Sequence, residues 1–412
     1  MTDRSARTRR GLLRGVGTLA LVGLAGCSED DEDDPTETPA DDAEPPADDT
    51  DADEGEAEGD EDEDDGSEDG GEGTGEAWPM FRYDAANTGV GDGSGPTGEG
   101  SDLWTVETGG SVYGSPTIVD GVVFVGSYDE SLYAIGVEEG DVLWELDLGG
   151  DVFSSPAVLD GFAYVGSFDG NLYVVDVEAG EIESQRSLGD AVGASPTISE
   201  GTIYVGTDSG EVHALGANEW TAETDGPVVA TPAVADGRVF VGSFGGILSA
   251  HDAETGEVEW ALDDGSTFEA TPTVSDGVVY AGTEDGRFYA LAADDGDLVW
   301  GVEGGDWTAS GAAAFDGVVY AGNANGALAA FDATDGSEVW TVDTGGAVWS
   351  SPTVADGVVY VANREGAVLG YDAGDGEEVY GTGIGEVVFS SPTPVGGRLY
   401  VGTADGAIHA LE

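Results

Sequence analysis

The sequence predicts an all-β fold, an eight-bladed β-propeller of four-stranded antiparallel blades, and three observations favour this prediction. A short motif, mostly Ser-Pro or Thr-Pro, returns every 40 residues with one interval of 36, which gives eight units. Each unit has the same order of tight turns and short apolar segments. The two ends of the repeated region are incomplete, and together they make one unit. Repetition of one unit at a fixed period is typical of repeat folds.

The motif sets one register through the repeated region. It reads Ser115-Pro116, Ser155-Pro156, Ser195-Pro196, Thr231-Pro232, Thr271-Pro272, Ser351-Pro352 and Ser391-Pro392. Gly311-Ala312 takes the remaining position. The short unit loses its third turn, because residues 216–219 replace a longer turn that the other units have.

Each unit has the same internal order. A short strand ends in a two-residue turn such as Asp120-Gly121, and an apolar strand such as 122–125 follows. Asp-Gly pairs favour the positive φ angles of a tight hairpin. A loop with glycine, a third strand such as 132–135, another turn and a fourth strand complete the unit. Four strands per unit, without a competing helical period, predict a propeller blade.

A tryptophan returns in the fourth strand of most units. It stands at Trp104, Trp144, Trp220, Trp260, Trp300 and Trp340, and Ser184 and Tyr380 take the two other places. Large apolar rings at a fixed place on outer strands indicate packing between blades rather than contact with a ligand.

The ends of the repeated region predict how the ring closes. Trp104 lies in a fourth-type strand ahead of the first full unit, and the last unit stops after its third strand, at 407–412. One N-terminal strand and three C-terminal strands therefore complete the eighth blade, which leaves no exposed sheet edge.

Residues 1–27 are predicted to be a twin-arginine-type lipoprotein signal. Arg9 and Arg10 precede an apolar stretch that is too short to span a bilayer. The stretch ends in Leu-Ala-Gly ahead of Cys27, which resembles a lipobox, and Cys27 is the only cysteine, so no disulfide forms within the chain. We expect export and anchoring to the outer face of the cell membrane through a lipid on Cys27 alone. The alternative is a soluble export signal with a chance cysteine.

Residues 28–76 are predicted to be a disordered acidic tether. They contain 27 Asp or Glu residues and neither arginine nor aromatic residues. Such a segment cannot bury enough apolar surface to offset its chain entropy. A spacer between the anchor and the propeller at 77–412 is the simplest role.

The charge balance is extreme, with 85 acidic residues, 11 basic residues and a formal net charge of −74. All basic residues are arginine, and the excess persists from Ala77 onward, where 57 acidic residues face 6 arginines. This balance argues against nucleic-acid binding, which needs a basic face. The composition resembles that of proteins from salt-in halophilic archaea. The alternative explanation of the acidic excess is a solvated acidic tail.

The candidate binding residues lie in the connections that vary among units, since the fourth-to-first and second-to-third connections share one face of a propeller. The candidates are Tyr113, Tyr128, Phe153, Phe168, Glu269, Trp307, Trp349, Arg364 and Phe389. Their aromatic members predict an arc on half of the channel mouth, which suits a protein or peptide partner. The alternative is that these rings plug the channel entrance or pack between blades.

No catalytic constellation stands out. His213 and His409 occupy a place that holds tyrosine in other units, and His251 is one strand position away, so packing is predicted for all three. We find no metal-ligand spacing, catalytic triad or phosphate-binding glycine loop. We therefore expect no cofactor or metal, no enzymatic activity and a monomeric chain.

Two stretches carry a family resemblance. Residues 250–260 and 330–340 read AHDAETGEVEW and AFDATDGSEVW, which resemble the tryptophan-docking repeat of pyrroloquinoline-quinone propellers. Residues 78–89 also resemble the usual lead-in of that family. The resemblance covers about residues 77–412 and implies the same ring.

The family has two branches with different functions. The resemblance to quinoprotein dehydrogenases implies a quinone and a Ca²⁺ ion in the channel, an Asp base, Glu and Asn ligands and typically an adjacent pair of cysteines. The propeller region here lacks cysteine and has short connections. Asn323 and Asn325 are Ca²⁺ ligands in principle, but a tight turn with positive φ is the favoured interpretation.

The other branch resembles the cofactor-free lipoprotein scaffold of bacterial outer-membrane assembly, an anchored ring with short loops. This resemblance implies a lipid-anchored, cell-surface scaffold that binds protein and takes part in the assembly of envelope or secreted proteins. The alternatives are a quinone- and Ca²⁺-dependent dehydrogenase and a ligand- or carbohydrate-binding surface module. A shared fold does not decide among these functions.

Overall fold

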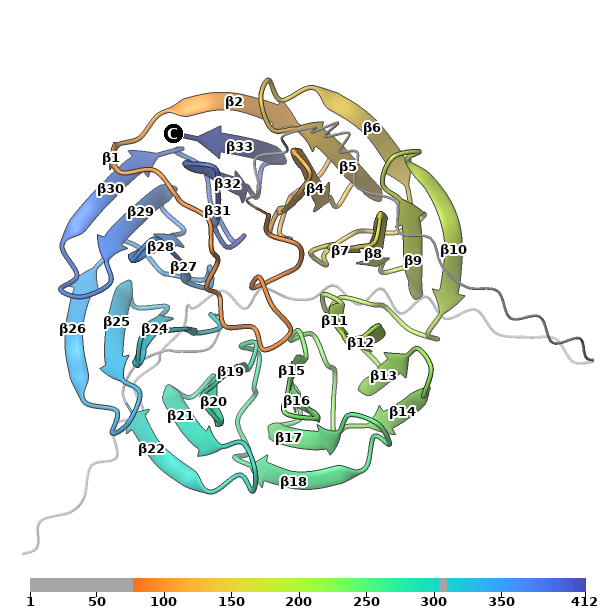
Figure 1. The fold of residues 1–412 in the computed structure, drawn as a ribbon, viewed down its shortest axis with the longest axis vertical. Coiled ribbons are helices and arrows are strands. Elements are labelled where there is room, and N and C mark those ends of the chain that lie inside the picture. Colours follow the sequence, from red (N-terminus) through yellow and green to blue (C-terminus); the bar gives the residue numbers. More distant parts are fainter. Residues whose placement is uncertain (1–76, 304–309) are drawn as a thin grey trace, which may run out of the picture. The chain divides into compact units, whose positions relative to one another are not determined.

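The computed structural model describes residues 77–303 and 310–412, and these form a ring of eight β-sheets, as the sequence predicted (Figure 1). The predicted export signal with Arg9, Arg10 and Cys27, the predicted tether and Trp307 lie outside the described residues. In the described part of the chain, no helix is long and apolar enough to cross a membrane.

The blades are named A to H in chain order, and the strands of each run from the channel outwards. Blade A contains β3 (Thr117–Val119), β4 (Val122–Gly126), β5 (Ser131–Gly136) and β6 (Val142–Asp147). Blade B contains β7 (Ala157–Leu159), β8 (Phe162–Gly166), β9 (Asn171–Asp176) and β10 (Glu181–Ser187). Blade C contains β11 (Thr197–Ser199), β12 (Thr202–Gly206), β13 (Glu211–Leu215) and β14 (Trp220–Glu223). Blade D contains β15 (Ala233–Ala235), β16 (Arg238–Gly242), β17 (Ile247–Asp252) and β18 (Val258–Asp263).

The other four blades repeat this order. Blade E contains β19 (Thr273–Ser275), β20 (Val278–Gly282), β21 (Arg287–Ala292) and β22 (Leu298–Glu303). Blade F contains β23 (Ala313–Phe315), β24 (Val318–Gly322), β25 (Ala327–Asp332) and β26 (Glu338–Asp343). Blade G contains β27 (Thr353–Ala355), β28 (Val358–Ala362), β29 (Ala367–Asp372) and β30 (Glu378–Gly383), and β1 (Gly98–Glu99) joins its outer edge in parallel. Blade H contains β31 (Thr393–Val395), β32 (Arg398–Gly402), β33 (Ala407–Leu411) and β2 (Asp102–Glu107).

Blade H closes the ring in the way that the sequence predicted. Strand β2 pairs antiparallel with β33, and the register places Trp104 opposite Ala410 and Glu107 opposite Ala407. The N-terminal strand thus covers the last C-terminal strand, so both ends of the chain's repeated region are held in one sheet.

The Ser-Pro motif links neighbouring inner strands. The backbone N–H of Ser115 donates to Oγ of Ser155 (2.8 Å), and Thr117 Oγ1 donates to the carbonyl of Pro156 (2.6 Å). The N–H of Ser391 donates to Oγ of Ser115 (2.8 Å), so the same link crosses the closure point. These hydroxyls satisfy backbone groups at the crowded inner edge, which explains why Ser or Thr returns there.

The tryptophans dock between blades, as predicted. Trp104 Nε1 donates to the carbonyl of Val137 in the next blade (2.9 Å), and Trp300 Nε1 donates to that of Ala333 (2.9 Å). Trp144, Trp220, Trp260 and Trp340 make the equivalent bond. Each ring lies on a turn glycine of the next blade, and a Cβ on Gly336 would stand 2.6 Å from the ring of Trp300.

We predict that Gly336→Ala destabilises the ring far more than Gly317→Ala. Both glycines have positive φ, +71° and +76°, so both variants bear backbone strain of about 1 kcal/mol. Only Gly336 faces a ring, since nothing lies within 4 Å of a Cβ at Gly317. We expect a further loss of roughly 1–3 kcal/mol for Gly336→Ala from overpacking. Thermal melts of the two variants measure the difference, and equal melting temperatures would contradict the docking role.

A segment at residues 78–97 crosses the centre of the ring, which the sequence interpretation did not foresee (Figure 1). We call it the central segment. Its carbonyls accept the N–H groups of the middle residues of six inner strands, namely Ile118, Val158, Val234, Val274, Ala314 and Val354. Those N–H groups lie on the free edge of each blade, so the central segment satisfies edges that would otherwise face the channel.

Two buried side chains fix the central segment. The Arg82 guanidinium donates to the carbonyls of Ala312 and Pro352, and Asn87 Nδ2 donates to the carbonyls of Pro232 (3.1 Å) and Pro272 (3.2 Å). These acceptors belong to the Ser-Pro positions of blades D to G. The central segment therefore crosses the channel at the level of that motif, and the connections that precede the motif form the mouth above this segment.

Candidate functional site

The mouth is built from two connections of each blade. The N–H of Tyr128, in the second-to-third connection of blade A, donates to the carbonyl of Ser111 in the fourth-to-first connection (2.9 Å). The N–H of Arg364 donates to Ala347 in blade G in the same way (3.0 Å). Backbone pairing thus places both variable connections on one face, as the sequence predicted.

The structure brings six of the predicted residues into one continuous cluster, which we call the aromatic arc. Its members, in order around the mouth, are Phe168, Phe153, Tyr128, Tyr113, Phe389 and Trp349. The ring centroids of Tyr113 lie 4.8 Å from Tyr128 and 5.2 Å from Phe389, and Phe389 lies 5.6 Å from Trp349. All six side chains are half-buried, so each packs on a neighbour and still keeps a surface toward solvent.

Arg364 ends the aromatic arc with a positive charge. Its guanidinium carbon lies 4.7 Å from the Trp349 ring centroid and 5.4 Å from that of Phe389. This geometry is typical of a cation–π contact. Within residues 77–303 and 310–412, Arg364 forms no ion pair with a carboxylate, so its donors face the mouth without an internal counter-ion.

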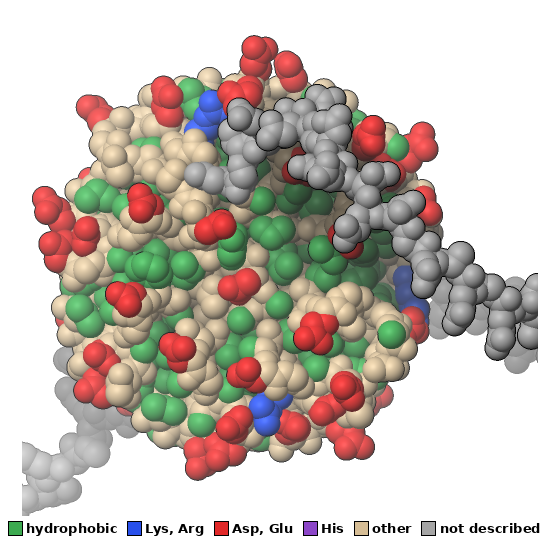
Figure 2. All heavy atoms as spheres, in the orientation of Figure 1, with side chains coloured by type: hydrophobic (Ala, Val, Ile, Leu, Met, Phe, Trp, Pro, Cys, Tyr) green, Lys and Arg blue, Asp and Glu red, His purple; other side chains and the backbone are tan. Residues whose placement is uncertain are grey.

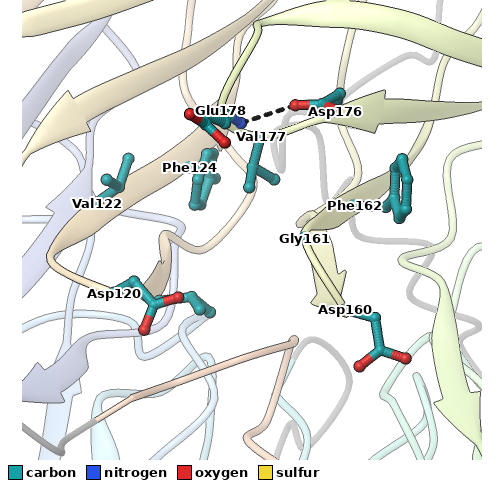
Figure 3. A pocket seen from close by; sticks show the side chains of 10 residues that line it. Asp120, Val122, Phe124, Asp160, Gly161, Phe162, Asp176, Val177 and Glu178 are labelled. Carbon is teal, nitrogen blue, oxygen red and sulfur yellow. Dashed lines mark hydrogen bonds between the residues drawn. The ribbon is translucent and has the colours of Figure 1, made fainter. Parts of the chain in front are cut away.

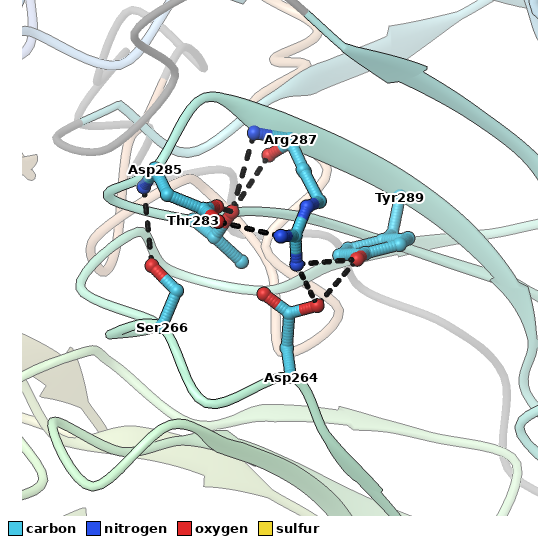
Figure 4. A network of polar contacts seen from close by, with 6 residues as sticks. All are labelled: Asp264, Ser266, Thr283, Asp285, Arg287 and Tyr289. Atoms are coloured by element: carbon cyan, nitrogen blue, oxygen red, sulfur yellow. Dashed lines mark hydrogen bonds and ion pairs between the residues drawn. The ribbon is translucent and has the colours of Figure 1, made fainter. Parts of the chain in front are cut away.

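Arg287 shows the contrasting arrangement in blade E (Figure 4). Its guanidinium pairs with Asp264 and lies 2.7 Å from Asp285, while Tyr289 OH donates to Asp264 (2.6 Å). The hydrogen bonds and carboxylate charges raise the pKa of Arg287. In that network two carboxylates pair with the Arg287 guanidinium, whereas no described carboxylate pairs with Arg364.

Carboxylates flank the other end of the aromatic arc. Burial raises the pKa of Tyr128, and the neighbouring Tyr113, Asp151 and Asp208 raise it further. Burial also raises the pKa of Asp208, with a smaller contribution from the charge of Asp190. The mouth is thus polarised, with a cation at the Trp349 end and carboxylates beyond Phe168.

Glu269 lies in the other half of the mouth and makes no ring contact with the aromatic arc. Glu269 keeps an exposed surface, but partial loss of hydration raises the pKa of its carboxyl group, and the charge of Glu284 raises it further. The sequence interpretation missed Asp208 and Phe244, which occupy the same repeat position as Tyr128 and Phe168. Alignment of the second-to-third connections would have found both.

The histidines are packing residues, as predicted. His213 Nδ1 lies 3.1 Å from Thr221 Oγ1, and His409 Nδ1 lies 3.2 Å from Thr105 Oγ1 on the adjacent outer strand. His251 stacks on Trp220 with 6.2 Å between centroids and 12° between planes. Burial lowers the pKa of His213 and of His251, which favours their neutral forms.

The donor set of the described residues does not fit the quinone and Ca²⁺ that the family resemblance implies. Within those residues, no group of three His, Cys, Asp or Glu side chains converges on a metal position. Asn323 Oδ1 accepts the N–H groups of Asn325 (3.1 Å) and Ala327 (2.9 Å), so it holds its own turn. The predicted tight turn with positive φ is confirmed, and Gly326 takes that conformation at +91°.

Comparison with protein families identifies one match. A family model described as outer membrane protein assembly factor BamB matches residues 96–215, 168–303 and 299–412, which together span most of the chain. A search of curated proteins finds no match.

Solved structures of similar fold include a BamB protein, dehydrogenases and a designed protein. BamB from Moraxella catarrhalis is 19% identical, with a TM-score of 0.66 over 76% of this chain and 99% of that one. Quinohemoprotein alcohol dehydrogenase from Comamonas testosteroni is 15% identical, with a TM-score of 0.69 over 81% and 80%. The computationally designed Ika8 protein is 16% identical, with a TM-score of 0.67 over 77% and 99%. At such identities the likeness establishes the fold alone.

Proposed function

This chain belongs to the pyrroloquinoline-quinone-repeat propeller family whose model is described as outer membrane protein assembly factor BamB, and from this membership we propose that it is a protein-binding scaffold. The observation that carries the proposal is the continuous aromatic arc with Arg364 at its end. Aromatic and arginine side chains dominate the binding energy of protein interfaces. The central segment, which crosses the channel, favours a partner that lies across the mouth rather than one that enters the channel.

The polarity of the mouth restricts how a partner binds. An extended segment with apolar side chains can pack on the aromatic arc, and an acidic group near one end can bind Arg364. The carboxylates Asp151 and Asp208 repel acidic groups at the other end. This arrangement supports one orientation of the bound segment over its reverse.

The cellular setting is part of the same proposal. A lipid on Cys27 anchors the exported chain to the outer face of the cell membrane, and residues 28–76 act as the spacer. In a halophilic cell, the scaffold contributes to the assembly or maintenance of envelope or secreted proteins.

A photo-crosslinking residue placed at Tyr113 of the full-length chain tests the proposal in living cells. We expect cross-links to one defined protein, with a yield that falls at least about threefold when Trp349→Ala removes the aromatic anchor at the Arg364 end of the arc. The matched control carries the crosslinker at Leu143, an exposed residue of the outer strand β6. No cross-link at the mouth, or a yield that Trp349→Ala leaves unchanged, would overturn the scaffold role.

A titration of the folded full-length chain with pyrroloquinoline quinone distinguishes the proposed scaffold function from a dehydrogenase function. The titration is carried out in molar KCl with and without Ca²⁺. We expect no saturable binding, because the described donors do not fit the pair. Saturable, Ca²⁺-dependent binding would refute the scaffold assignment and justify assays with alcohols or sugars and an electron acceptor.

A further inference from the structure

Six of the eight blade junctions have a backbone carbonyl that accepts the Nε1–H of a docking tryptophan, and the other residues beside this carbonyl differ from junction to junction. The acceptor is the carbonyl that receives the docking tryptophan, such as Val137 between blades H and A. A carbonyl oxygen has two lone pairs, so one remains for a second donor. At this junction Arg398, the first residue of β32, donates to Val137 (2.8 Å) and to the Glu138 carboxylate (3.0 Å).

At three other junctions, a polar side chain of one blade contacts the next blade close to the same carbonyl. Arg238, the first residue of β16, pairs with Asp294 of the next blade (3.2 Å), which is the counterpart of Glu138. Tyr320 OH donates to the carbonyl of Ala373 (2.9 Å), and Tyr204 OH lies 3.2 Å from that of Ala253. An arginine at the start of the second strand, or a tyrosine two residues later, thus forms a polar contact with the next blade at these junctions.

The junction between blades A and B has neither donor. Val122 stands where Arg398 and Arg238 stand in their blades, and Phe124 stands where Tyr204 and Tyr320 stand. The carbonyl of Val177 receives Trp144 Nε1 (3.0 Å) and no second donor from a described residue. The missing side chains leave a pocket of about 430 Å³ at this junction.

The pocket combines apolar walls with uncompensated carboxylates (Figure 3). Phe124, Phe162 and Val177 line its walls, Asp120 and Asp160 stand at one rim, and Glu178 stands at the opposite rim. Within residues 77–303 and 310–412, these three carboxylates form no ion pair. Asp176 also lines the pocket, and these like charges raise its affinity for a cation that also has an apolar stem.

We propose that this pocket binds an alkylguanidinium group supplied from outside the chain. The planar group would take the position that the Arg398 guanidinium occupies one junction earlier, donating to the free lone pair of Val177 and to Glu178. The alkyl stem would lie on Val122 and Phe124. A planar guanidinium can donate to a carbonyl and to a carboxylate at the same time. An ammonium group carries a compact, strongly hydrated charge and therefore fits this pair of acceptors less well.

The inference is independent of the proposed scaffold function. The pocket lies beside the Asp120-Gly121 and Asp160-Gly161 turns, at the opposite end of the inner strands from the aromatic arc. The source of the group is either a small alkylguanidine or an arginine side chain of a partner protein, and the recognition chemistry is the same for both.

The indole ¹H–¹⁵N signal of Trp144 tests the proposal on the full-length chain, because this group shares the Val177 carbonyl with the ligand. The probes are agmatine, an Ala-Arg-Ala peptide amide and the isosteric Ala-citrulline-Ala amide, which lacks the charge. We expect saturable shifts of the Trp144 signal with agmatine or the arginine peptide, and none with citrulline. The Trp300 signal, from the equivalent bond in blade E, should not move.

Two substitutions locate the binding. Val122→Arg places the chain's own guanidinium in the pocket and should abolish the shifts, whereas Val278→Arg at the same position of blade E should leave them unchanged. If Val122→Arg does not fold, Glu178→Gln should weaken binding about threefold or more, because it removes a charged partner.

The outcomes are distinguishable. Tighter binding of the arginine peptide than of agmatine supports a protein source, and equal binding supports a small molecule. Shifts that citrulline reproduces, shifts that persist in Val122→Arg, or no shift of Trp144 with either cationic probe would overturn the proposal. None of these results depends on whether the aromatic arc binds a partner.

Discussion

Deletion of residues 101–108 will open the ring and lower its melting temperature by roughly 10 °C or more, as expected when several kcal/mol of packing are lost from a domain of this size. The deleted stretch contains β2, which covers the free edge of β33. It also removes Trp104, which docks on Val137 and so ties blade H to blade A. Without it, the closure depends on the hydrogen bond from the Ser391 N–H to Ser115 Oγ, on the Arg398 contacts with blade A and on the inner strands.

Two further chains make this result specific. Replacement of residues 101–108 by a Gly-Ser segment of equal length keeps the connection to β3 and should cause a similar loss, because it also removes the apolar strand. Deletion of eight residues from the predicted tether, at 51–58, should leave the melt unchanged. A propeller that melts normally without β2 would contradict the observed closure. Thermal melts by circular dichroism measure all three chains.

Transfer from about 3 M to about 0.1 M KCl will unfold the protein, since the Debye length grows from under 3 Å to about 10 Å. From Ala77 onward, 57 acidic residues face 6 arginines, so the folded ring concentrates one sign of charge. Among the described arginines, Arg82 is buried against carbonyls and Arg364 lies on rings, which leaves few cations to offset the acidic surface. Self-repulsion then opposes the compact state.

A chain that lacks residues 28–76 tests whether the acidic excess reflects a salt requirement of the blades or only a solvated acidic tail. If the blades themselves require salt, this chain should unfold at low KCl nearly as the full chain does. Loss of the salt dependence on deletion would instead assign it to a solvated acidic tail. Far- and near-ultraviolet circular dichroism against KCl concentration follows the transition in both chains.

The sequence by itself determined the repeated part of the fold. The period of the Ser-Pro motif predicted the number of blades, the Asp-Gly pairs predicted the hairpins, and Trp104 predicted the closing strand. Each of these features is local, because turn geometry and strand alternation are encoded within a few residues. The aromatic arc was also predictable, because residues at equivalent positions of successive units become neighbours once the ring closes.

Only the tertiary structure decided which groups meet across the ring. Residues 78–97 carry no period, yet they cross the channel, and Arg82 finds its acceptors 230 and 270 residues away. The free charge of Arg364 and the pocket at Val122 depend on which partner each neighbouring blade supplies. The repeated sequence pattern specifies the fold of one blade. These contacts instead depend on residues that differ between blades, and such residues meet only when ring closure brings distant parts of the chain together.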